Sequence, residues 1–519
     1  MPSLILPRRQ FLGSAFSVGL LSACSSLGTN GRSFARDPFA LGVASGEPAS
    51  DGFVIWTRLA PDPLAPAGGM PPQPAPVAWE VASDPQFRQI VQSGETLAEP
   101  AEAHSLHIEI TGLLPHRPYW YRFHAGAATS DVGRAVTLPM PGARVDEVRI
   151  ASTGCQDFEK GYYTALAHLA REDALDAVYH YGDYIYEFGP RGEHPLRIHA
   201  GGETATLADY RQRYAQYKSD PDLRAAHAAA PFIVAFDDHE IDDNWASDIG
   251  KDHGATAAFA ARKAAAMQAW YEHMPVRPAL RYGPTTQYFR RFDFGNLIAM
   301  HVLDTRSHRS KQLCEPTIEQ REAGWACSLD YDPARTMLGE QQERWLDAGL
   351  AGKQRWNFLA QQVKVMPFDA RDDGESQPRF STDNWNGYPF ARERLVQSIA
   401  RHAPGNVVIA SGDMHQNLIG SVPSDLRDPT SAPIASEFLA TSVSSGGTGS
   451  LRHSHQQQAL DNNPNAILLN NQRGYHIHAI TASSWTASVK VMDQIDTPDG
   501  RISELARFEV EHGRPGPVQ

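Results

Sequence analysis

The sequence predicts an α/β fold in which a layered sheet-and-helix domain follows a small all-β sandwich. Residues 38–138 contain short strand-like runs separated by Pro and Gly, and they lack helical periodicity. Residues 139–143, Pro-Met-Pro-Gly-Ala, have the composition of a linker. Beyond the linker, strands alternate with helical segments, which is typical of buried parallel sheets covered by helices. The predicted divisions are therefore a leader and spacer over 1–37, a sandwich over 38–138 and a larger domain over 146–513.

Length and charge restrict the classes of function. A chain of 519 residues is too long for one hydrophobic core, so two or three domains are expected. The formal net charge of −13 argues against a nucleic-acid-binding surface, which needs a basic footprint. An anionic substrate is compatible with this charge, because a metal site supplies local positive charge.

The first residues are typical of a targeting segment. Arg8 and Arg9 precede an apolar run that ends near Leu21, too short for the ~20 residues of a membrane span. The paired arginines resemble a twin-arginine export signal, so the export machinery is an expected partner and the protein is expected in the periplasm or outside the cell. The motif Leu-Ser-Ala-Cys ending at Cys24 also resembles a lipoprotein processing site, with a lipid anchor on Cys24. The alternative is that Cys24 is removed with the signal.

Cysteine usage singles out one thiol. Cys314 and Cys327 lie close together in a polar segment, and an exported protein could join them. With Cys24 assigned to the signal, Cys155 has no partner. Metal ligation would explain such a thiol, and a buried inert cysteine is the alternative.

The strand-like runs between 53 and 123 favour an immunoglobulin-like sandwich, and residues 113–121 resemble a strand entry of fibronectin type III domains. Further along, 204–230 and 255–274 are expected to form covering helices. Residues 475–480 and 485–491 are expected to form a hairpin. The polar segment 445–471 is predicted to be a loop that either lies near the site or is mobile, and 513–519 are predicted to fray.

The strongest pattern is that strand after strand ends in residues that bind metal or phosphate. These ends are Gly154-Cys155, Gly182-Asp183, Asp237-Asp238-His239, Asp304-Thr305-Arg306 and Gly412-Asp413-Met414-His415. Buried parallel strands bring their carboxyl ends to one edge of a sheet. We therefore expect six side chains to converge: Cys155, Asp183, Asp238, His239, Asp413 and His415.

Asp183 and Tyr186 form an unusual pair of candidate ligands. A phenol with a pKa of ~10 ligates as phenolate only beside a strong Lewis acid such as ferric ion. Cys155 and His415 would favour a trivalent or softer ion. The alternative for this stretch is a surface turn with an exposed Asp183 and a packed Tyr186.

Asp238 and Asp413 offer the oxygen donors that Ca²⁺ prefers, and Asp183 could bridge two cations. Such a pair can activate a hydroxide that attacks phosphorus and can neutralise the phosphoryl group. His239 is then a natural general acid for the leaving group. Arg306 could pair with phosphate oxygens, or it could pair only with Asp304.

Together these motifs resemble the PhoD-type alkaline phosphatases, which belong to the metallophosphoesterase class that includes purple acid phosphatases. The resemblance extends over most of the chain after the signal. It is carried by Gly154-Cys155, Gly182-Asp183-Tyr-Ile-Tyr186-Glu187, Asp237-Asp238-His239-Glu240, Gly412-Asp413-Met414-His415 and Asp383-Asn-Trp385-Asn-Gly387-Tyr388.

The resemblance implies a metallophosphoesterase-type fold and an exported enzyme that cleaves phosphate esters at alkaline pH with Fe³⁺ and Ca²⁺. The implied ligands are Cys155, Asp183, Tyr186 and His415 for iron, and Asp183, Asp238 and Asp413 for calcium. Asp238 and Asp413 stand where purple acid phosphatases carry Asn and His, and oxygen donors favour calcium over zinc. Two alternatives are a phosphodiesterase, including a phospholipase D-like enzyme, and a calcium-binding lipoprotein without catalytic activity.

Overall fold

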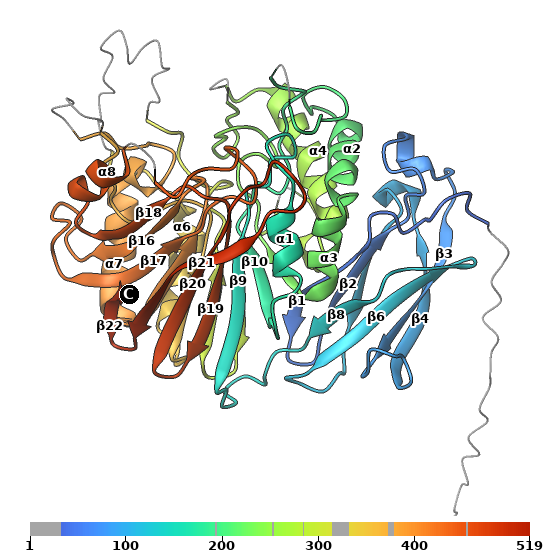
Figure 1. The fold of residues 1–519 in the computed structure, drawn as a ribbon, viewed down its shortest axis with the longest axis horizontal. Coiled ribbons are helices and arrows are strands. Elements are labelled where there is room, and N and C mark those ends of the chain that lie inside the picture. The colour runs from blue at the N-terminus through green and yellow to red at the C-terminus, as the bar shows by residue number, and fades with distance from the viewer. Residues whose placement is uncertain are drawn as a thin grey trace, which may run out of the picture.

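The computed structural model describes residues 33–192, 195–251, 254–283, 285–313, 332–371, 378–452 and 455–519. Figure 1 shows a large body of sheets and helices beside a smaller β region formed by the N-terminal part of the chain. The predicted α/β class with an all-β region in front is therefore confirmed. The predicted export signal, Cys24 and the pair Cys314 and Cys327 lie outside the described residues.

The first large sheet has 10 strands and is parallel at its centre, where β10 pairs with both β9 and β11. Antiparallel strands extend the sheet on both sides. In spatial order the strands are β22 (Arg514–Val518), β21 (Ile502–Glu511), β20 (Ser484–Met492), β19 (Gly474–Thr481), β9 (Glu147–Thr153), β10 (Ala177–His180), β11 (Phe232–Val234), β1 (Val43–Ala49), β2 (Gly52–Arg58) and β5 (Ser105–Ile110).

The second large sheet has 7 strands, and its parallel part runs from β13 through β14 and β15 to β17. In spatial order its strands are β12 (Arg290–Phe294), β13 (Ile298–Val302), β14 (Trp356–Ala360), β15 (Val407–Ser411), β17 (Pro433–Leu439), β16 (Asn417–Pro423) and β18 (Ala466–Asn470).

The two sheets pack face to face and helices cover their outer faces, which gives four layers. Alternation along β9 explains the layering, because Ile150 lies in the core between the sheets and Ala151 lies in the core under the helices. The first sheet is covered by α1 (Thr164–Leu169), α2 (Leu207–Lys218), α3 (Pro221–Ala229) and α4 (Ala257–His273). The second is covered by α6 (Gly339–Leu350) and α7 (Pro389–His402), and α8 (Gln456–Asn462) lies against β18.

Short 3₁₀ turns complete the described elements: η1 (Pro66–Gly69), η2 (Pro100–Glu102), η3 (Pro278–Leu280) and η4 (Trp385–Gly387). No helix among the described residues combines the length and the apolar composition that a membrane span needs.

The N-terminal β region is a sandwich that shares strands with the large sheet. Its second sheet consists of β3 (Ala75–Ala82), β4 (Ile90–Ala98), β6 (Pro118–Ala125), β7 (Ala128–Thr129) and β8 (Gly133–Val136). Phe53 and Ile55 of β2 pack against Val77 and Tyr121 to form its core. Because β1 also pairs in parallel with β11, one face of the sandwich continues into the α/β body. The division at residues 138 and 146 therefore stays a prediction.

Two of the local predictions are wrong. The segment 445–471 contains α8 and β18 rather than a continuous loop, because the apolar residues 466–469 within it pair with β16 and bury Leu469. Residues 514–518 form β22 rather than a frayed end. Its two prolines are tolerated because β22 is the edge strand of the sheet. The covering helices at α2, α3 and α4 and the hairpin of β19 and β20 are confirmed.

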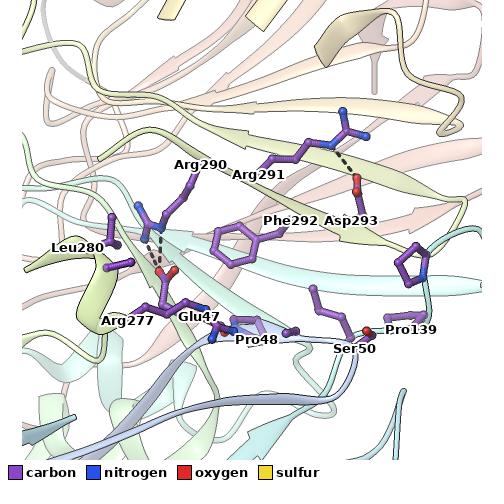
Figure 2. A pocket seen from close by; sticks show the side chains of 14 residues that line it. Glu47, Pro48, Ser50, Pro139, Arg277, Leu280, Arg290, Arg291, Phe292 and Asp293 are labelled. Atoms are coloured by element: carbon purple, nitrogen blue, oxygen red, sulfur yellow. Dashed lines mark hydrogen bonds and ion pairs between the residues drawn. The ribbon is translucent and has the colours of Figure 1, made fainter. Parts of the chain in front are cut away.

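A buried ion pair fastens the N-terminal strands to the α/β body. Arg290 of β12 donates from Nε to Oε1 of Glu47 at 2.8 Å and from Nη2 to the carbonyl of Val234 at 2.8 Å. Figure 2 shows Arg290 reaching Glu47 in a hollow of about 430 Å³ that β1, the 138–141 segment and β12 line. Because Glu47 and Pro48 of β1 and Arg290 and Phe292 of β12 all line the hollow, it lies at the junction between the two regions.

We predict that Arg290→Ala weakens this junction. Removing one partner of a buried pair leaves an uncompensated charge and costs on the order of 3–5 kcal/mol. The melting temperature should therefore fall by several degrees. Arg144→Ala is the control, since the Arg144–Asp146 pair is 88% and 86% exposed and is worth at most ~1 kcal/mol. Equal melting temperatures for the two variants would contradict the assignment.

Candidate metal centre

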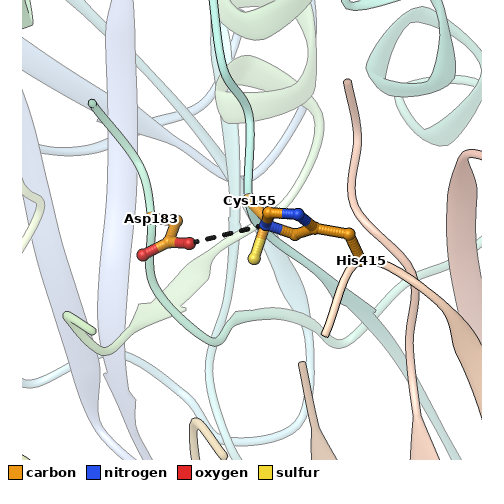
Figure 3. Close-up of side chains that lie close together, drawn as sticks. All are labelled: Cys155, Asp183 and His415. Carbon is orange, nitrogen blue, oxygen red and sulfur yellow. Dashed lines mark ion pairs between the residues drawn. The ribbon is translucent and has the colours of Figure 1, made fainter. Parts of the chain in front are cut away.

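The side chains predicted to converge lie together at the carboxyl ends of four strands. β9 leads to Cys155, β10 to Asp183, β11 to Asp238 and His239, and β15 to Asp413 and His415. Ligand atoms of three groups lie within 4.8 Å of one another: Cys155, Asp183 and His415; Asp183, Asp238 and His239; and Asp237, Asp238 and Asp413. Figure 3 shows the first group, in which the thiol, the carboxylate and the imidazole face one another.

The backbone at these strand ends is held in an uncommon conformation. The φ angles of Cys155, Asp183, Asp413 and His415 are 53°, 53°, 69° and 56°. Non-glycine residues rarely adopt positive φ, and the surrounding structure has to hold them there. Such strain gathers at functional sites, and its occurrence at four neighbouring candidate ligands supports that interpretation.

Gly154 and Gly412, which directly precede candidate ligands, both lie against the ring of Tyr181, where a larger residue would not fit. A Cβ on Gly154 or on Gly412 would overlap the ring of Tyr181, which lies between the two strand ends. The Tyr181 hydroxyl donates to the carbonyl of Thr441, so the ring is fixed. The ends of β9 and β15, which belong to different sheets, are thus pressed onto the same ring. This contact sets the spacing between Cys155 and Asp413.

Tyr186 joins the first group through its phenol. Its hydroxyl donates to Oδ2 of Asp183 at 3.0 Å and lies 3.1 Å from Nε2 of His415. Asp183 is 1% exposed, so the alternative of a surface turn with an exposed Asp183 and a packed Tyr186 does not apply. The four candidate iron ligands, Cys155, Asp183, Tyr186 and His415, thus lie in one cluster.

The donor chemistry fits bound cations. Burial, followed by the charges of Asp183 and other acidic neighbours, raises the pKa of Cys155 well above its ordinary value. The same causes raise the pKa of Tyr186. Oδ1 of Asp183 and Oδ1 of Asp238 are buried and have no hydrogen-bond partner among the described residues. Buried carboxylate oxygens without hydrogen bonds are costly, and metal coordination is one way in which proteins satisfy them.

A second cluster of carboxylates surrounds Arg306. This fully buried side chain donates to Asp237 and to Oδ1 of Asp383 at 3.0 Å. Its Nη2 also lies 3.5 Å from Oδ1 of both Asp238 and Asp413. The alternative of a side-chain pair with Asp304 is wrong, because Asp304 instead accepts the backbone N–H of Arg306 at 3.1 Å. Contact between Arg306 and phosphate stays a prediction.

His239 is held at the edge of the cluster. Its Nδ1 lies 2.8 Å from Oε2 of Glu187, and its ring stacks on Tyr186 with centroids 4.1 Å apart. Burial lowers the pKa of His239, but the charges of Asp238, Glu187 and Asp183 outweigh burial and raise the pKa well above its ordinary value. The side chain is 13% exposed. The protein's own groups therefore favour a protonated imidazole near solvent.

Solvent reaches the cluster from one side. The side chains of Asp413 and His415 are 22% and 31% exposed, whereas those of Asp183 and Asp238 are 2% and 4% exposed. The cations that fit between these groups would thus be covered by protein on the sheet side and open at Asp413, His415 and His239. A substrate has access from that open side.

Several contributors were missed by sequence reasoning. Glu240 accepts backbone N–H groups of Asp183, Tyr184 and Asp237 at 3.1, 2.7 and 2.9 Å, so it fixes two strand ends against each other. Glu187 and Glu240 each directly follow an assigned residue, and that adjacency was the available signal. Asp383 stood in a quoted motif without a role. Ser445 begins the segment expected near the site, but no sequence signal marked its hydroxyl, which lies 2.6 Å from that of Tyr186.

The four-layer fold and this cluster define a metal-dependent phosphoester hydrolase. The family model described as PhoD-like phosphatase matches residues 150–489, and that of its N-terminal domain matches residues 23–139. The chain therefore belongs to the PhoD-like phosphatase family. It is 43% identical to alkaline phosphatase D of Bacillus subtilis (strain 168) over 494 residues, which cover 93% of this chain and 82% of the relative.

A solved structure described as the structure of PhoD shares the fold along nearly the whole chain. It is 42% identical, its TM-score is 0.87, and the match covers 94% of this chain and 93% of that one. The predicted family and the predicted hydrolysis of phosphoric esters are thus confirmed. The ligand assignments and the identities of the ions stay predictions.

We predict that Gly412→Ala disrupts the centre. The new Cβ would meet the fixed ring of Tyr181, so the segment carrying Asp413 and His415 has to move. A displacement of about 1 Å can cost roughly 10²-fold in rate, and bound metal should fall as well. Metal content and phosphatase activity would be compared with those of Gly202→Ala, whose Cβ meets nothing within 4 Å. Retention of both properties in Gly412→Ala would refute the spacing role of Tyr181.

Proposed function

We propose that this phosphatase acts through two kinds of cation, Fe³⁺ and Ca²⁺, that share Asp183. Cys155, Tyr186 and His415 would complete the iron site, and Asp238 and Asp413 would hold calcium. The observation that carries the proposal is the meeting of a thiol, a phenol, an imidazole and several buried carboxylates at one point. Bound there, the cations supply Lewis-acid activation of water and neutralise the phosphoryl charge.

The division between the two ions follows from the donors. The phenol of Tyr186 and the thiol of Cys155 have raised pKa values in this site, so only a strongly polarising ion would hold them as anions. Asp238 and Asp413 offer hard oxygen atoms, which suit calcium. Asp183 has one oxygen near Tyr186 and another without a partner among the described residues, and this suits a bridge.

His239 is the proposed general acid. Glu187 holds Nδ1 and thereby fixes the ring, so that Nε2 remains for the leaving-group oxygen. Stacking on Tyr186 and an edge contact with Phe188, with centroids 5.2 Å apart, restrict the ring further. Arg306 would keep Asp237 and Asp383 neutralised while the cations occupy Asp238 and Asp413.

The proposed setting is outside the cytoplasm, in the periplasm or beyond it. Support comes from the paired arginines at Arg8 and Arg9, the short apolar run after them and the lipoprotein-like motif at Cys24. Export in a folded state would allow the buried ligands to take up iron beforehand. The expected partners are a phosphate-ester substrate, the twin-arginine machinery for the precursor and a membrane only through Cys24.

We predict that chelation of calcium stops hydrolysis. The purified protein would be assayed with an aryl phosphate monoester and with the matching diester, each with and without a calcium-selective chelator. Cleavage of the monoester should be lost with the chelator and return with added Ca²⁺, while bound iron stays constant. Chelator-resistant cleavage would remove calcium from the proposal. Faster cleavage of the diester would identify the enzyme as a phosphodiesterase instead.

We predict that His239→Ala lowers kcat by ~10²–10⁴-fold, the usual contribution of a general acid. The loss should be larger for an alkyl phosphate than for a nitrophenyl phosphate, because a poor leaving group needs the proton more. Glu187→Gln should show the same leaving-group dependence with a smaller loss, because the ring is held less firmly. His301→Ala is the control, since His301 is a core histidine whose Nε2 lies 3.2 Å from Asn357. An equal loss for both substrates would exclude His239 as the acid.

A further inference from the structure

Ser445 places a hydroxyl group against the phenol of Tyr186. The residue is 2% exposed and lies in the chain segment that follows β17. Its Oγ is 2.6 Å from the Tyr186 oxygen and 2.8 Å from the carbonyl of Cys155, and it accepts the backbone N–H of Asp157 at 3.2 Å. One buried hydroxyl thus touches the phenol and the backbone of two neighbouring residues.

The single proton of Ser445 can be shared with only one of its two acceptors. In the protonated phenol, the Tyr186 hydroxyl donates to Asp183, and its uncharged oxygen is a weaker acceptor than an anion would be. Once the phenol loses its proton, its oxygen becomes an anionic acceptor, and a charge-assisted hydrogen bond is roughly twice as strong as a neutral one. The Ser445 proton should then point to Tyr186 rather than to the carbonyl of Cys155.

The segment that carries Ser445 is fixed by a buried arginine. Arg473 is 3% exposed, and it donates to the hydroxyl of Ser442 and to the carbonyl of Ser445. Ser442 in turn donates to the carbonyl of Ser445 at 2.6 Å. The backbone that carries Ser445 is therefore fixed, and the hydrogen bonds of Oγ to the backbone of Cys155 and Asp157 hold the hydroxyl.

We propose that Ser445 is a positioning residue that donates a hydrogen bond to the Tyr186 phenolate and weakens the donation of electron density from that phenolate to the bound metal. This inference rests on the proposed ferric site. A hydrogen bond lowers the energy of the phenolate lone pairs, so it raises the energy of the phenolate-to-iron charge-transfer transition. Ser445 would thereby moderate the charge that Tyr186 transfers to the ion beside Asp183.

The test is the visible spectrum of the iron-loaded protein. Tyr186→Phe should abolish the phenolate band and so identifies it. Ser445→Ala should retain iron and shift the same band to longer wavelength. The matched control is Ser444→Ala, because Ser444 is an adjacent buried serine whose hydroxyl donates to the carbonyl of Asp157 at 2.7 Å. Its band should stay where it is in the wild-type protein.

A second measurement needs no variant. In the wild-type protein, the resonance-Raman C–O stretch of the phenolate should shift on transfer to D₂O, because the donated proton exchanges. An unmoved band in Ser445→Ala, or a stretch that D₂O leaves unchanged, would overturn the inference while the iron site stands. Wild-type protein that holds no iron, or iron without a phenolate band, would overturn the proposed ferric site itself. The two failures are therefore distinguishable.

Discussion

Repulsion between buried carboxylates is the constraint on which the rest of this structure depends. Asp183, Asp237, Asp238 and Asp413 meet in a space closed on the sheet side, and burial together with mutual repulsion raises the pKa of Asp183 and Asp413 well above the ordinary value. Isolated buried charges cost far more free energy than a surface ion pair returns. Bound cations would relieve this repulsion, and three groups of these side chains could hold them. Arg306 supplies one positive charge, and the geometry of the remaining oxygens leaves space for metal ions.

The two-sheet architecture explains how these groups come together. Cys155, Asp183 and Asp238 follow strands of one sheet, whereas Asp413 and His415 follow a strand of the other. The site is complete only where the ends of both sheets meet, and the ring of Tyr181 between Gly154 and Gly412 fixes that meeting point. Packing of Ile150 and Tyr179 against Phe358 and Val408 in the shared core therefore also determines the distances between candidate ligands.

The sequence predicted the parts of the structure that follow from local rules. Asp, His or Cys residues that follow parallel strands can be predicted to lie close together, because the carboxyl ends of such strands lie at one edge of a sheet. The residues that follow β9, β10, β11 and β15 do lie close together. The rule does not reach contacts that depend on tertiary packing. Arg306 was expected to pair with phosphate or only with Asp304, and neither expectation included its carboxylate partners, which come from three separate segments. Ser445 reaches Tyr186 across 259 residues of sequence, and nothing in its local pattern indicates that contact.

Because the large sheet continues into the N-terminal region, that region covers the edge of the sheet at β11. Strands β1, β2 and β5 add to the sheet at β11, and β11 carries the segment that leads to Asp238 and His239. Without them, the backbone groups along one side of β11 would be an open edge, which invites pairing with other chains. By covering this edge of β11, the smaller region protects from aggregation the strand that leads to Asp238 and His239.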